Sequence, residues 1–89
     1  MAKKIYQFTG LKETNKNILE NGYFPVIKLG IQGPEGTKFK LNNGGEISIG
    51  RYNIYELDLT NLGGLITSLI FVSDPTGVIV DIVYEGGDS

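Results

Sequence analysis

The sequence has 89 residues, 40% hydrophobic and 20% charged, which suits one globular domain and excludes a disordered chain. Its net charge of −2 argues against a nucleic-acid partner, because phosphate binding requires a basic surface. No run approaches the ~20 apolar residues of a membrane span, and residues 1–8 lack the apolar core of a signal peptide. Cysteine and histidine are both absent, which excludes disulfides and thiolate or imidazole metal ligands.

The first half of the chain contains three predicted strands. Residues 4–8 form the first, and residues 24–31 form the second, with Pro25 confining its start to a sheet edge. Residues 33–36 (Gly-Pro-Glu-Gly) predict a turn, because proline presets φ and glycine accepts positive φ. Residues 37–41 then alternate strictly between polar and apolar, which is typical of a half-buried strand.

The stretch 11–22 between the first two strands is ambiguous. It could be a short helix ended by Gly22, with one apolar stripe formed by Leu11, Ile18 and Leu19. Alternatively, Asn21-Gly22 is a hairpin turn, or the stretch is a loop. We favour the hairpin or the loop, because the polar residues 12–17 are poor helix formers.

The middle of the chain predicts a hairpin and a further strand. Residues 42–45 (Asn-Asn-Gly-Gly) tolerate the left-handed conformations of a tight turn, and residues 46–49 return as the partner strand. Residues 53–60 alternate again, with apolar side chains on one face and polar side chains on the other.

Two strands are predicted near the end of the chain. Residues 65–72 are apolar on both faces, as in a central strand or one that contacts another subunit. Residues 74–77 (Asp-Pro-Thr-Gly) fit a type I turn, and residues 78–84 form the last strand.

These elements predict an all-β fold: a small antiparallel, jelly-roll-like β-sandwich of about 6–8 short strands, with residues 1–89 as one domain. The predicted core consists of the residues on the apolar sides of the alternating stretches: Phe39, Leu41, Ile47, Ile49, Tyr55, Leu57, Leu59, Leu69, Phe71, Val80 and Ile82.

Residues 65–72 also predict an interface. If Leu69 and Phe71 fill the core, strict alternation places apolar side chains on the opposite face, and these candidate interface residues are Ile66, Ile70 and Val72. A sandwich of this size has one core, so a second subunit or the 11–22 segment must cover that face.

The residues offer little for catalysis or metal binding. Without histidine or cysteine, a Ser-His-Asp or Cys-His arrangement is impossible. Glu56, Asp58 and Asp81 are interpreted as solvent-facing strand residues, with a calcium site as the weaker alternative. No catalytic residue, metal or cofactor is therefore expected. Tyr23 and Tyr52 lie in predicted turns and are the aromatic residues expected to be exposed.

Three segments carry a resemblance to a known family. Residues 30–39 read Gly-Ile-Gln-Gly-Pro-Glu-Gly-Thr-Lys-Phe, residues 49–59 read Ile-Gly-Arg-Tyr-Asn-Ile-Tyr-Glu-Leu-Asp-Leu, and residues 80–85 read Val-Asp-Ile-Val-Tyr-Glu. Together they resemble segments of small β-rich virion structural proteins, associated with the head, neck or tail, in phages of Firmicutes and related gut bacteria. The likeness covers about residues 26–85.

The resemblance implies a non-enzymatic virion protein, assembled in the host cytoplasm, with a decoration, fibre or attachment role. Its expected partners are other virion proteins and further copies of itself, without nucleic acid or membrane. Residues 1–25 fall outside the likeness, and residues 1–23 could form an N-terminal attachment segment. The alternative is a carbohydrate-binding or host-adhesion module that recognises a host surface glycan.

Overall fold

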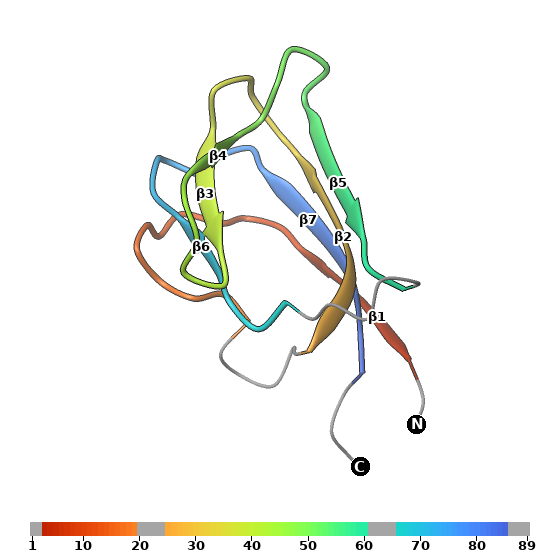
Figure 1. Ribbon diagram of the computed structural model, residues 1–89. Helices are drawn as coiled ribbons and strands as arrows, with labels where there is room; N and C mark the ends of the chain where they lie inside the picture. The colour runs from red at the N-terminus through yellow and green to blue at the C-terminus, as the bar shows by residue number, and fades with distance from the viewer. Residues whose placement is uncertain (1–2, 20–24, 61–65, 86–89) are drawn as a thin grey trace.

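The computed structural model describes residues 3–19, 25–60 and 66–85. These residues form seven strands and no helix: β1 (Lys4–Phe8), β2 (Val26–Gln32), β3 (Lys38–Leu41), β4 (Ile47–Ser48), β5 (Ile54–Asp58), β6 (Leu69–Phe71) and β7 (Ile79–Tyr84). All the pairings are antiparallel, in a four-stranded sheet of order β1-β7-β2-β5 and a three-stranded sheet of order β4-β3-β6. The two sheets lie face to face (Figure 1), which confirms the predicted small β-sandwich.

The strand order is that of a jelly roll with one strand reduced to a single bridge. Asn17 forms an isolated antiparallel bridge with Ile70 of β6, which adds a short eighth segment to the edge of the three-stranded sheet. When this segment is counted as the second of eight strands, the two sheets read 1-8-3-6 and 2-7-4-5. Each strand of the first half of the chain therefore pairs with strands of the second half, as in a rolled-up long hairpin.

The predicted hairpin at residues 42–45 is present between β3 and β4. Asn42 and Asn43 have φ angles of 51° and 61°, and the N–H of Gly44 donates to the carbonyl of Leu41 at 2.9 Å. Two consecutive left-handed residues define a type I′ turn, whose twist matches that of the flanking strands. The asparagines therefore explain why the chain reverses here.

The turn predicted at residues 74–77 is shifted by one residue. The N–H of Val78 donates to the carbonyl of Pro75 at 3.0 Å, so that Gly77 occupies the third position, with φ +83°. A third position with positive φ favours glycine for steric reasons. Residues 34–37 form the same Pro-x-Gly arrangement between β2 and β3.

The core lies between the two sheets. Every predicted core residue is buried or packs against the buried cluster, which confirms that prediction. The core also contains residues that were not predicted, from the central strand β2 and from outside regular strands: Leu19, Val26, Ile27, Leu29, Ile31, Ile66 and Val78. Strand β2 contributes so much because it has neighbours on both edges and the second sheet on its inner face.

Residues 11–19 form a loop that ends beside β6. The backbone N–H groups of Asn15 and Ile18 donate to carbonyl oxygens of β6 at 2.8 and 3.0 Å. The helix considered for this stretch is therefore absent over these residues, and the turn at Asn21-Gly22 lies outside the described residues. Residues 4–8 pair with β7 in the four-stranded sheet, and Asn17 bridges to Ile70 of β6, so both parts of this segment pack on the sandwich.

The interface predicted for Ile66, Ile70 and Val72 requires a correction at Ile66. Its side chain is 2% exposed and lies in the core, and its backbone exchanges two hydrogen bonds with Val26, at 2.8 and 2.9 Å. Strict alternation fails because β6 begins only at Leu69, and the irregular backbone before it lets Ile66 and Leu69 both point inward.

The other two predicted interface residues, Ile70 and Val72, are half-buried. The 11–19 loop borders this strand and pairs with Ile70 through Asn17. The loop therefore lies at the edge of β6, beside Ile70 and in the plane of the three-stranded sheet.

Candidate functional site

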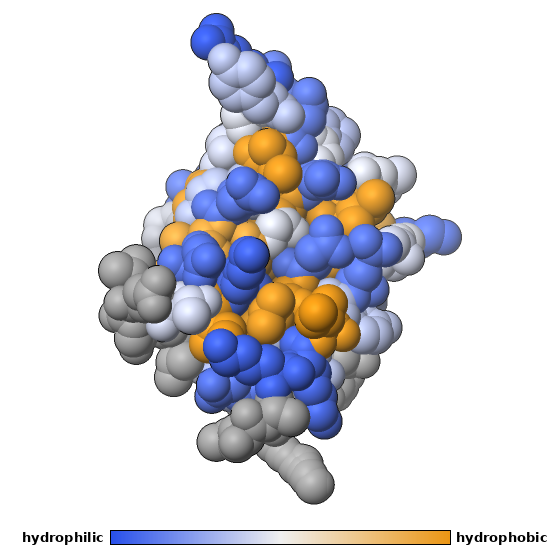
Figure 2. All heavy atoms as spheres, turned by 90° about the vertical axis from the view of Figure 1, so that its right-hand side faces the viewer, coloured by the Kyte–Doolittle hydropathy of each residue, from blue (hydrophilic) through white to orange (hydrophobic). Residues whose placement is uncertain are grey.

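The outer face of the four-stranded sheet is an exposed surface of the sandwich. Side chains of β2 alternate, so that Leu29 and Ile31 are buried in the core while Lys28 and Gln32 point to the opposite side. Within the part of the chain that the structure describes, no strand packs on this outer face. Figure 2 views the molecule from this side and shows hydrophobic groups interleaved with hydrophilic ones.

A hollow lies at the middle of this face, over Gly30. The register places Gly30 opposite Glu56 of β5 on one side and Asp81 of β7 on the other. Because glycine has no side chain, the space between these two carboxylates is open. We call this site the Gly30 hollow. The outward-facing residues that line it are Ile5, Lys28, Gly30, Gln32, Ile54, Glu56, Asp58, Asp81 and Val83.

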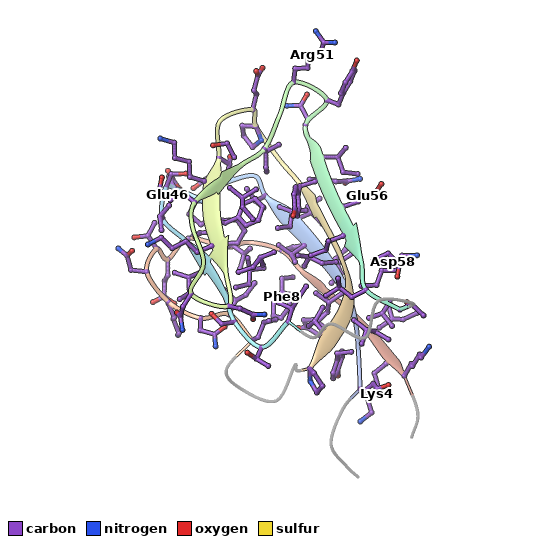
Figure 3. The ribbon with its side chains drawn as sticks, in the orientation of Figure 1. Lys4, Phe8, Glu46, Arg51, Glu56 and Asp58 are labelled. Carbon is purple, nitrogen blue, oxygen red and sulfur yellow. The ribbon has the colours of Figure 1, made fainter. Side chains whose placement is uncertain are left out.

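The carboxylates of the Gly30 hollow differ in their partners. Asp81 accepts a hydrogen bond of 2.7 Å from the side-chain amide of Gln7. The side chain and backbone N–H of Thr60 hydrogen-bond to Asp58 and hold the pKa of this carboxyl below its ordinary value. Glu56 has no hydrogen bond or ion pair to any residue in the described ranges. Figure 3 shows Glu56 and Asp58 projecting outward from β5.

The three carboxylates that suggested a calcium site do not converge. Glu56 and Asp58 lie on β5 and Asp81 lies on β7, and β2 runs between these strands. The described residues contain no group of three acidic side chains that could hold a metal ion. The hollow is therefore better suited to a group that hydrogen-bonds to one or two carboxylates than to a chelated cation.

The second exposed feature is the loop between β4 and β5. The N–H of Asn53 donates to the carbonyl of Gly50 at 3.0 Å, and Asn53 has φ 63°. Asn53 is also tied to Gly33 at the end of β2: its carbonyl accepts from the Gly33 N–H (3.0 Å), and its amide donates to the Gly33 carbonyl (3.1 Å). These bonds hold the loop at a fixed position beside the end of the four-stranded sheet.

Arg51 and Tyr52 form the tip of this loop. Tyr52 is 77% exposed, and the Arg51 guanidinium lies 5.1 Å from the centre of its ring and donates to its hydroxyl at 3.2 Å. We call this pair the Arg51–Tyr52 tip. The structure thus places Tyr52 at the surface, whereas Tyr23 lies outside the described residues.

No protein-family model, curated protein or solved structure matches this chain. The described residues contain no helix that is long and apolar enough to span a membrane. Among the described residues, the Gly30 hollow and the Arg51–Tyr52 tip are exposed features that carry groups able to bind a partner.

Proposed function

We propose that this protein is a non-enzymatic structural protein of a bacteriophage virion. It assembles on the head, neck or tail, with a decoration, fibre or attachment role, through contacts with other virion proteins and further copies of itself. The observation that carries the proposal is the outer face of the four-stranded sheet, where Ile5 is 81% and Ile54 is 37% exposed beside charged side chains. Protein–protein interfaces combine apolar side chains with a rim of polar groups, and this face offers both.

Two further observations support a virion role. The segments 30–39, 49–59 and 80–85 resemble virion structural proteins, and all three belong to the same sandwich. Jelly rolls are common in viral capsid and lectin domains, although a fold alone does not define a function. The sequence also lacks histidine and cysteine, the residues on which most acid–base and nucleophilic catalysis depends.

The proposal is tested by mass spectrometry of gradient-purified particles of the phage that encodes the chain. We expect its peptides to stay with the particles through the gradient, at a copy number comparable to known structural proteins, while a non-structural protein of the same phage is lost. Antibody labelling in electron microscopy would then locate it on head, neck or tail. Its presence in infected cells but absence from particles would overturn the proposal.

A carbohydrate-binding or host-adhesion module is the second candidate, and the exposed Tyr52 favours it. Its ring borders a shallow depression that also contains the amide side chains of Gln32 and Asn53. An aromatic face beside amide groups can stack on a sugar and hydrogen-bond to its hydroxyls. On a glycan array, this function predicts binding that Tyr52→Ala abolishes and Tyr6→Ala, a change at another exposed tyrosine, preserves. No binding by the wild type would exclude it.

A further inference from the structure

Gly30 is a glycine that the chain's own fold does not require. It lies within β2 and pairs regularly with Glu56 and Asp81, and the register shift of this strand lies elsewhere, between Val26 and Lys28. Its φ is not positive, and a Cβ atom built on it would meet no atom within 4 Å. Glycine weakens a strand interior, and without a bulge or a bend it often marks a place where another molecule approaches closely.

Gly33, three residues further along the chain, is by contrast a glycine that packing within the chain requires. A Cβ atom there would lie 2.8 Å from a side-chain methyl group of Val78, which is buried. Gly33 is therefore explained by packing within the chain. No comparable contact explains Gly30, so the space above it is available to a group from outside.

The chemistry of the Gly30 hollow favours a cation attached to an apolar group. Its three carboxylates outnumber its one ammonium group, that of Lys28, and the Glu56 carboxylate lacks a partner among the described residues. The apolar side chains of Ile5 and Ile54 lie on the rim. A guanidinium group stacked on an aromatic ring would pair with the carboxylates and also contact the apolar rim.

The Arg51–Tyr52 tip has this chemistry. Arg51 is the only arginine in the sequence, and its stacking on Tyr52 holds the planar guanidinium beside an exposed ring. Arginine and tyrosine are enriched in protein interfaces and among the residues that contribute most to binding. The described residues with large exposed apolar groups are Ile5, Tyr6, Tyr52 and Ile54. All of these except Tyr6 belong to the tip or to the rim of the hollow.

The tip does not occupy the hollow of its own chain. Figure 3 shows Arg51 at the end of the sandwich, pointing away from Glu56 and Asp58. We propose that the Arg51–Tyr52 tip of one copy binds in the Gly30 hollow of a second copy, where Arg51 pairs with Glu56. This contact deepens the proposed assembly role, on which it rests, by naming the surfaces through which copies of the chain associate. It joins two different surfaces, so repetition builds a ring or a filament, unless the two copies exchange tips.

The contact is tested by charge reversal and mixing. The masses of the wild type, Arg51→Glu and Glu56→Arg would be measured by light scattering at low ionic strength, where charge pairs are least screened. We expect the wild type to be oligomeric and each variant to be monomeric. An equimolar mixture of the two variants should regain the wild-type mass, because each tip then meets a hollow of opposite charge. Lys38→Glu, on the other sheet, is the control that should keep the wild-type mass.

Recovery of the wild-type mass on mixing cannot result from a corrected folding defect, because mixing does not change the sequence of either variant. Circular dichroism of each variant alone confirms that it is folded. A wild type that is monomeric at every concentration, an Arg51→Glu variant that keeps the wild-type mass, or a mixture that stays monomeric would each overturn the contact. If the protein is present in purified particles and the mixture stays monomeric, the virion role stands and the contact is wrong.

Discussion

Asn17 holds the 11–19 loop against the edge of β6, and its removal should cost a large part of the stability. Its side-chain oxygen accepts hydrogen bonds from the backbone N–H groups of Leu19 (3.0 Å) and Leu69 (3.1 Å). Both of these residues are fully buried. In Asn17→Ala the two N–H groups lose their acceptor in a site with little access to water. An unsatisfied buried group costs about 1–3 kcal/mol, so we expect a loss of about 2–5 kcal/mol.

The loss would be measured as the shift of the urea midpoint, followed by circular dichroism. A domain of this size is stable by roughly 5 kcal/mol, so Asn17→Ala should unfold at a much lower urea concentration than the wild type. Asn17→Asp is the matched control, because it keeps the accepting oxygen and should keep most of the stability. An unchanged midpoint for Asn17→Ala, or equal losses in both variants, would refute the role of this side chain.

Two further predictions concern glycine packing and pH. Gly33→Ala should lower the free energy of unfolding by about 1–3 kcal/mol, because its Cβ would press against the buried Val78. Gly30→Ala should be neutral or stabilising by up to about 1 kcal/mol, because its Cβ meets no other atom. Equal thermal midpoints for the two variants would contradict this difference. The side-chain hydroxyl and backbone N–H of Thr76 hydrogen-bond to Asp74 and lower its pKa below its ordinary value of 3.8. A lowered folded-state pKa stabilises the protein above pH 3.8, and this contribution is lost as the pH falls through the folded-state pKa. Thermal melts should therefore show a larger difference between wild type and Asp74→Ala at pH 7 than near pH 2, and a difference independent of pH would contradict the assignment.

Local patterns in the sequence were sufficient to predict the fold class and most of the core. The alternation in residues 37–41 and 53–60 depends only on which side chains are apolar, and both stretches are strands with the expected inward faces. The two asparagines of the β3–β4 hairpin adopt the left-handed conformations that their residue type favours. Such features are set by neighbours in the chain, and the sequence displays them directly.

The candidate site could not be predicted in the same way, because it depends on which strands become neighbours. Glu56 and Asp81 were identified as surface carboxylates, but their position on either side of Gly30 follows from the order β5-β2-β7. That order joins segments far apart in the chain. The signal that was overlooked is Gly30 itself, a glycine between Leu29 and Ile31 in an otherwise apolar strand.

The prediction for residues 65–72 was partly wrong for a related reason. It assumed that the whole stretch is one regular strand, whereas β6 contains only Leu69–Phe71. The backbone pairing of Ile66 with Val26 at the start of β2 turns its side chain into the core. Alternation predicts faces correctly only where the backbone stays extended.

The most direct test of the account compares the solution mass of the wild type with that of Gly30→Val. Valine favours strands and a Cβ atom at this position meets no other atom, so the variant should fold, with the circular dichroism spectrum of the wild type. Its side chain would fill the Gly30 hollow and block the Arg51–Tyr52 tip of another copy. We expect light scattering to give an oligomer for the wild type and the monomer mass of 9.7 kDa for Gly30→Val. A wild type at the monomer mass, or a well-folded Gly30→Val with the same oligomer mass as the wild type, would contradict assembly through this face.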